Sequence, residues 1–176
     1  TFSAGPANES SQTLVGYTVT VDNTALFSSA PAIDNNGKLT FTSALDANGS
    51  ALVTVVVQDN GGTDNGGVDK STNTFTITVT AVNDAPSVTF AQSTVTVLED
   101  AGAQSVNSFA TFSAGPANES SQTLVGYTVT VDNTALFSSA PAIDNNGKLT
   151  FTSALNANGS ALVTVVVQDN GGTANG

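Results

Sequence analysis

The sequence predicts an all-β fold in which antiparallel β-sandwiches are arranged in tandem as a 110-residue repeat. The first observation is composition. Thr, Val, Ser, Asn and Gly dominate; β-branched residues favour strands, and Asn and Gly favour tight turns. The second is that apolar residues alternate with threonines over short segments, while no segment has helical periodicity. The third is the repeat length, because a 110-residue unit is of ordinary size for one sandwich domain.

The repeat defines the organisation of the chain. Residues 1–66 recur at 111–176, so the chain holds more than one copy of the 110-residue unit. Because the copies are almost identical, we expect both to adopt the same fold. The copies differ at two positions, which are Asp46/Asn156 and Asp64/Ala174.

A domain junction is predicted at residues 82–87. One strand ends there, Pro86 interrupts the pattern, and a new strand begins. We therefore expect a first domain at 1–84 that lacks its first strand, and a second at 87–176 that lacks its last strand. The chain is interpreted as a window of a longer tandem array.

Seven strands are expected in each repeat unit, and four of them lie before residue 60. Segment 13–21 alternates apolar and polar residues, which predicts a half-buried strand. Leu26–Phe27 is a short apolar strand, and 38–42 follows an Asn-Gly turn. Segment 51–57 is nearly all apolar, which predicts a central strand buried on both faces.

The other three strands flank the junction. In 74–82 the apolar residues alternate with four threonines, so the apolar side chains are expected inside and the threonines outside. Segment 87–97 is expected to shift between sheets at a break near 91–93, and 104–113 completes the set. The residues expected to be mostly buried are Tyr17, Val19, Val53, Val55, Phe75, Ile77 and Val79.

The missing residue types exclude many functions. The chain has no His, Cys, Met or Trp, and its Lys and Arg together number three against fourteen acids, a net charge of −11. Catalytic triads, thiol nucleophiles and His- or Cys-ligated metals are therefore excluded, and a nucleic-acid surface is unsupported. A carboxylate pair could hydrolyse glycosides, but Tyr17 and Tyr127 are the only residues that could build a stacking platform of the Trp or Tyr type. We expect no enzyme, no catalytic residue and no membrane insertion in this segment.

Three segments carry a family resemblance. The strings VTVVVQDNGG (53–62), FTITVTAVNDAP (75–86) and VTVLEDAG (95–102) resemble bacterial cadherin-like and Ig-like tandem repeats of large extracellular or cell-surface, adhesin-like proteins. The resemblance implies an Ig-like sandwich, an extracellular location and a structural or adhesive role.

The resemblance also implies calcium, which such proteins hold between successive domains. Asn83 and Asp84 match the linker motif, and Glu99, with Asp100 beside it, matches the acid near the end of the first strand. These four residues form the first candidate calcium site. The match is incomplete, because the acid pair expected after the second strand is replaced by SAGPAN and Asn48 stands where another acid is expected.

A second candidate calcium site is the loop between Asp59 and Asp69. Its carboxylates, with Asp64 midway, recur at a spacing of five with glycines between them, and oxygen ligands and sharp turns suit this ion. The alternative is an ordinary solvated strand connection in which the glycines make turns. Asp64 corresponds to Ala174, so a site that needs this carboxylate fails in the second copy.

The function predicted from these observations is a structural module outside a bacterial cell. Tandem sandwiches would form an extended stalk, fibre or filament in adhesion or matrix, with calcium as the cofactor. The alternative is a carbohydrate- or protein-binding adhesive domain. Because each domain is expected to have an open sheet edge, neighbouring copies of the repeat are predicted partners, paired by strand exchange. The adhesive role adds a possible cell-surface or matrix ligand as a second predicted partner.

Overall fold

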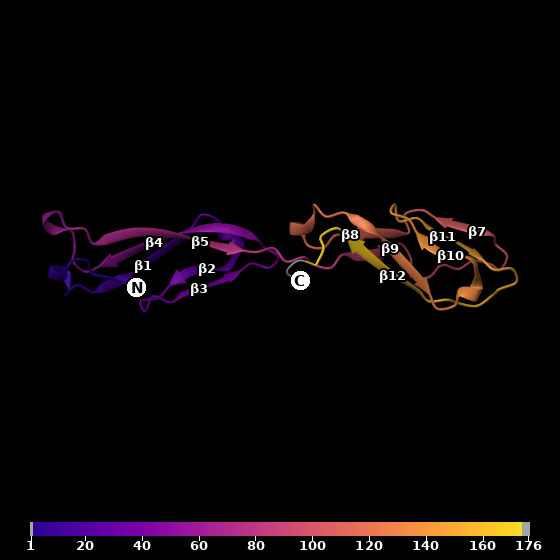
Figure 1. Ribbon diagram of the computed structural model, residues 1–176, viewed down its shortest axis with the longest axis horizontal. Helices are drawn as coiled ribbons and strands as arrows, with labels where there is room; N and C mark the ends of the chain where they lie inside the picture. Colours follow the sequence, from indigo (N-terminus) through magenta and orange to yellow (C-terminus); the bar gives the residue numbers. More distant parts are fainter. Residues whose placement is uncertain (1, 174–176) are drawn as a thin grey trace. The chain divides into compact units, whose positions relative to one another are not determined.

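The computed structural model describes residues 2–173, which form an all-β protein with antiparallel sheets and short 3-10 turns (Figure 1). The chain divides into two compact units, Thr1–Ala81 (unit 1) and Val82–Gly176 (unit 2). The division lies beside the junction expected at 82–87. Residues 174–176 of the expected second domain, including the copy difference at position 174, lie outside the described residues.

Unit 1 contains five strands, which are β1 (Leu14–Val21), β2 (Phe27–Ile33), β3 (Leu39–Ser43), β4 (Gly49–Asp59) and β5 (Lys70–Val79). Strands β1, β4 and β5 form one sheet in the order β1-β4-β5, and β2 pairs with β3 in a second. The core joins the two sheets, since Phe27 at the start of β2 packs with Val53 of β4 and Ile77 of β5. Its 3-10 turns are η1 (Ala7–Glu9), η2 (Thr24–Leu26) and η3 (Asp64–Gly66).

Unit 2 contains seven strands, which are β6 (Ser87–Phe90), β7 (Ala103–Val106), β8 (Ala110–Ser113), β9 (Leu124–Val131), β10 (Phe137–Ile143), β11 (Leu149–Ser153) and β12 (Val163–Asp169). They form the sheets β10-β11-β7, β12-β9 and β6-β8. Ala110, Ile143, Leu149 and Phe151 are the buried centre of the core. Its 3-10 turns are η4 (Ala117–Glu119) and η5 (Thr134–Leu136).

The two copies share their strand registers. β1 pairs with β4 from Leu14↔Asp59 to Val21↔Val53, and β9 pairs with β12 from Leu124↔Asp169 to Val131↔Val163. The β2–β3 and β10–β11 hairpins likewise form the same pairs at corresponding positions of the repeat. The strands common to both copies therefore form the same way in each unit.

The faces predicted for β5 are confirmed. Ile77 is buried, Phe75 and Val79 are half-buried, and the alternating threonines of this strand are exposed. Val53 of the neighbouring strand is fully buried. The apolar set therefore faces the core, because a one-residue slip would have exchanged the two faces.

Three strand predictions are wrong in detail. β4 is not buried on both faces, because Leu52 is 44% exposed beside the fully buried Val53. The strand expected at 26–27 extends to Ile33, since β2 pairs with β3 in a hairpin that its small residues did not reveal. The strand expected at 104–113 is two strands, because Ser108 adopts a positive φ of 51° between them.

The strand expected at 87–97 ends at Phe90, as the break predicted near 91–93 requires, but residues 94–97 beyond the break form no strand. Within the described residues, unit 1 therefore has five strands, the number expected for a first domain that lacks its start, and unit 2 has seven. A separate question is membrane insertion. Within residues 2–173, no helix is long and apolar enough to cross a membrane.

Candidate functional site

The linker residues Asn83 and Asp84 are held at one end of unit 2 by the loop that contains η4. The backbone N–H of Asp84 donates to Glu119 Oε1 at 2.6 Å. The side-chain amide of Asn83 donates to the carbonyl of Gly172 at 2.9 Å, and its Oδ1 accepts from Gln122 Nε2 at 2.7 Å. Two segments far apart in the sequence, the loop of Glu119 and Gln122 and the segment at Gly172, therefore converge on this linker.

The same place holds buried oxygen atoms that lack hydrogen bonds. Glu119 is 3% exposed and Asp169 is 6% exposed. Among the described residues, the buried side-chain oxygens and nitrogens without a partner are Glu119 Oε2, Gln122 Oε1 and Asp169 Oδ2. Leaving such a group unpaired in the interior is costly, and for a carboxylate the cost is larger. We call Asn83, Asp84, Glu119, Gln122 and Asp169 the linker cluster.

Short-range hydrogen bonds hold the loop residues of the linker cluster in place. Gln122 donates its backbone N–H to the carbonyl of Glu119 at 2.8 Å, which closes the turn after η4. Asp169 Oδ1 accepts from the N–H of Gly171 at 2.9 Å, so its other oxygen, Oδ2, is the one left unpaired. A Cβ at Gly171 would overlap the side chains of Asn83 and Gln122. The glycine therefore permits the close packing of the linker on this loop.

Unit 1 offers a comparison with the same sequence. Its counterparts of Glu119, Gln122 and Asp169 are Glu9, Gln12 and Asp59. Glu9 and Asp59 are half-buried where Glu119 and Asp169 are buried, and both glutamines are half-buried. Thr13 and Asn60 exchange the same hydrogen bonds as Thr123 and Asn170, so the local loop is the same in both copies. The deeper burial of Glu119 and Asp169 in unit 2 accompanies the contacts that Asn83 and Asp84 make there.

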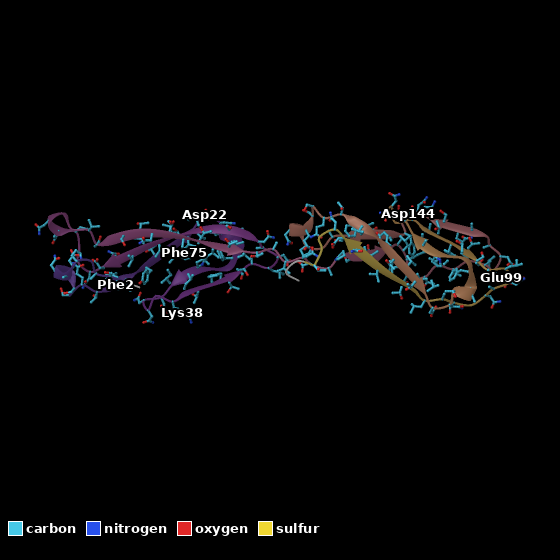
Figure 2. The ribbon with its side chains drawn as sticks, viewed as in Figure 1. Phe2, Asp22, Lys38, Phe75, Glu99 and Asp144 are labelled. Atoms are coloured by element: carbon cyan, nitrogen blue, oxygen red, sulfur yellow. The ribbon has the colours of Figure 1, made fainter. Side chains whose placement is uncertain are left out.

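The structure does not bring the four residues of the first candidate calcium site together. Glu99 and Asp100 lie at the end of unit 2 opposite the linker cluster, where Figure 2 labels Glu99. There Asp100 Oδ1 accepts from the N–H of Asn156 at 2.8 Å, and Glu99 Oε2 lies 3.4 Å from Asn158 Nδ2. Both acids are exposed, so they form a separate surface pair.

The second candidate site, the loop from Asp59 to Asp69, uses its carboxylates as turn acceptors. Asp59 Oδ1 accepts from the N–H of Gly61 at 2.8 Å, and Asp69 Oδ2 accepts from Gln58 Nε2 at 2.8 Å. The N–H of Asp59 donates to the carbonyl of Asp69, which closes the hairpin. Asp64 is exposed at the start of η3. These bonds are those of an ordinary strand connection.

The linker cluster contains oxygen atoms of the kind that bind metal ions. Within residues 2–173 there is no group of three or more acidic, His or Cys side chains placed to hold a metal ion. The linker cluster offers something different, which is two buried carboxylates and a buried amide oxygen, each with an unused acceptor. Ca²⁺ accepts carboxylate, amide and carbonyl oxygens, so the donor types of these residues suit that ion.

Sequence reasoning missed Glu119, Gln122 and Asp169. The sequence showed only that SAGPAN replaces the expected acid pair, and Glu119 follows that string directly. Asp169 was known only as the counterpart of Asp59. An acid next to the replaced motif was the available indication, but its burial depends on contacts with Asn83 and Asp84, which are distant in the sequence.

Two sheet edges differ between the units. β3 of unit 1 pairs only with β2, whereas the identical β11 of unit 2 also pairs with β7. β12 pairs only with β9, whereas its counterpart β4 also pairs with β5. Within the described residues, β11 therefore has a neighbour that the identical β3 lacks, and β4 has a neighbour that its counterpart β12 lacks.

Comparisons with known proteins add no relative. No protein-family model, no curated protein and no solved structure matches this chain.

Proposed function

We propose that the chain is a structural repeat module of a large bacterial extracellular or cell-surface protein. Successive β-sandwiches would build a stalk or fibre that serves in adhesion or matrix, and the role is mechanical rather than catalytic. The resemblance of VNDAP and its flanking strands to cadherin-like repeats supports the extracellular location.

The observation that carries this proposal is the shared register of the two copies. The two copies of the repeated segment form the same strand pairs, although their sheet neighbours differ. A segment that folds the same way beside different neighbours can be added repeatedly to a chain. A net charge of −11 disfavours collapse of such an array, because like charges repel.

Calcium is part of the proposal, and the linker cluster is where we place it. Glu119 and Asp169 would supply carboxylate oxygens and Gln122 an amide oxygen, since these atoms are buried and have no other partner. The ion would supply positive charge to this acidic interior. Asn83 and Asp84 would remain bound to the loop through the hydrogen bonds already described.

The mechanical role is tested with chains of one, two and four repeat units. If the units add length, the largest dimension measured by small-angle X-ray scattering grows by a constant increment of at least roughly 26–33 Å per unit, since strands of 8–10 residues rise about 3.3 Å per residue. Growth of the radius of gyration with about the 0.38 power of chain length would instead indicate one compact body and contradict the proposal. Antibody labelling of intact cells tests the extracellular location.

A further inference from the structure

Unit 2 contains a groove between β12 and residues 94–98. A cavity of 610 Å³ lies there and is lined on one side by residues 94–98 and on the other by residues 159–163 and Val165. Val95 and Val97 alternate with exposed threonines and pack against the core, as in a strand, yet no strand forms at 94–98. Among the described residues, neither wall of the groove therefore has a sheet neighbour on that side.

We propose that this groove accepts a strand of the β5 type, with the sequence of Lys70–Val79, from a second copy of the repeat. The strand would pair antiparallel with β12 and cover the cavity. This inference deepens the proposed function and rests on it for the identity of the donor.

In unit 1, β5 is paired with β4, whose sequence is the same as that of the strand at the groove. β5 pairs with β4 along its whole length, from Gly49↔Val79 to Gln58↔Lys70. The sequence of β4 recurs without a change at residues 159–169. The register that β5 takes on β4 therefore predicts the register on β12, with Ile77 opposite Ala161 and Phe75 opposite Val163.

The cavity lies on the face that β5 fills in unit 1. The inward residues of β5 are opposite Gly49, Ala51 and Val53. Their counterparts in unit 2 all line the cavity, and these are Gly159, Ala161 and Val163. Val53 is 0% exposed beneath β5, whereas Val163 is 38% exposed. Phe75 and Ile77 would therefore cover apolar surface that is open in unit 2.

The backbone at the start of these two strands also differs between the units. β4 begins at Gly49, but β12 begins at Val163, so residues 159–162 are not a strand. Residues 49–52 of β4 have no ladder partner in β1, whose register ends at Val21↔Val53, and their ladder partners lie in β5. The hydrogen bonds of Leu52 with Asp22 recur between Leu162 and Asp132, so they do not make the difference. The strand state of this short segment therefore depends on a β5-type neighbour.

The proposed donor is another copy of the repeat, because the β5 that the structure describes is already paired with β4. An extended peptide that adds to an open sheet edge gains main-chain hydrogen bonds, and pockets for alternate side chains select its sequence. The groove supplies both, since its open edge is β12 and its cavity faces the alternate positions.

The inference is tested by adding a synthetic peptide of residues 68–82 to the 176-residue chain. We expect saturable one-to-one binding by calorimetry and new hydrogen-exchange protection at the amides of Gly159 and Ala161, measured by NMR. The N–H of Leu162 already donates to Asp132 Oδ1, so it faces the opposite side. In the peptide, Ile77→Asp should weaken binding by about tenfold or more, because an unpaired charge would enter the core. Thr76→Asp is the matched control and should bind like the parent peptide, since Thr76 faces solvent in β5.

The register is tested separately by disulfide trapping. The chain has no cysteine of its own, so only the introduced thiols can form a disulfide. With oxidised glutathione as the oxidant, Ser160→Cys should form a disulfide with a Thr78→Cys peptide, because the side-chain oxygens of the corresponding pair in unit 1, Ser50 and Thr78, lie 3.1 Å apart. A Thr74→Cys peptide should not react with Ser160→Cys and should react with Thr164→Cys, since Thr74 pairs with Thr54 in unit 1.

Equal binding of the Ile77→Asp and parent peptides, or no protection at Gly159 and Ala161, would overturn the inference. These outcomes are independent of the scattering test. If the length grows with repeat number but no peptide binds, the proposed function stands and the inference about the groove is rejected. If the peptide binds but the length does not grow, the inference about the groove stands and the mechanical role is rejected.

Discussion

Phe41 and Phe151 occupy the same position in identical strands, yet Phe41 is 42% exposed and Phe151 is 8% exposed. Each makes the same edge-to-face contact, with Phe27 at 5.7 Å and Phe137 at 5.9 Å between ring centroids. The difference arises from the third strand of the sheet, because β7 pairs with β11 and no described strand pairs with the outer edge of β3.

The first prediction follows from this pair. Phe151→Ala should destabilise unit 2 by about 3–5 kcal/mol, as expected for a buried phenylalanine, and Phe41→Ala should destabilise unit 1 by clearly less. The chain has one tyrosine in each unit, Tyr17 and Tyr127, and no tryptophan. Urea unfolding followed by tyrosine fluorescence in Tyr127→Phe and Tyr17→Phe backgrounds therefore reports each unit alone. Equal losses in the two units would contradict the role of β7.

The second prediction concerns calcium at the linker cluster. Calcium should raise the stability of unit 2, by about 2.7 kcal/mol at a hundredfold excess over Kd, because only the folded site binds it. Glu119→Gln should abolish this gain, since it removes a buried carboxylate oxygen that has no other partner. Glu9→Gln is the matched control in the other copy and should leave it unchanged. Identical unfolding of unit 2 in calcium and in chelator would reject the site.

The third prediction tests how tightly the linker packs. Gly171→Ala should destabilise unit 2 by about 1–3 kcal/mol, as overpacking does, because its Cβ would overlap Asn83 and the Gln122 side chain that Asn83 holds. Gly61→Ala meets only Gln12, whose side chain can move aside, so its cost should be smaller. Thermal unfolding of both variants with the tyrosine reporters makes the comparison. A larger loss for Gly61→Ala would show that the linker is not packed as described.

The fourth prediction is a pH dependence in unit 1. Asp34 Oδ1 accepts from the N–H groups of Asn36 and Lys38, each at 2.9 Å. The backbone hydrogen bond from Lys38 is the main cause that holds the pKa of Asp34 below its ordinary value of 3.8. Because folding lowers this pKa, the stabilisation is present above about pH 3.8 and is lost as the pH falls through the folded-state pKa.

Asp34→Ala should therefore be less stable than the parent at neutral pH, and the two should converge in strong acid. Asp34→Asn keeps a side-chain oxygen acceptor without titrating there, so it serves as the control. An NMR titration of the Asp34 carboxyl checks the direction of the shift. A pKa at or above 3.8 would contradict this account.

Several features of the fold follow from local sequence. The alternation of Phe75, Ile77 and Val79 with threonines predicted which face of β5 is buried, because successive strand residues point to opposite faces. The Asn36-Gly37 pair predicted the turn before β3, where Gly37 adopts a positive φ of 81°. Pro86 marked the junction beside which the chain divides.

The linker cluster could not be predicted in this way. Asn83 and Asp84 were expected beside Glu99 and Asp100, but they contact Glu119, Gln122 and Gly172 instead. Which loops meet at one end of a sandwich depends on how the sheets pack, and strand patterns do not encode that choice.

By itself the sequence determined the all-β class, the 110-residue repeat and the register of the strands that both copies share. Tertiary structure alone decided the rest, as the identical segments 49–52 and 159–162 show, since the first is strand and the second is not. The physical reason is that a strand is completed by hydrogen bonds to a neighbouring strand. Residues 49–52 find those bonds in β5, and their counterparts in unit 2 have no such neighbour in the described structure.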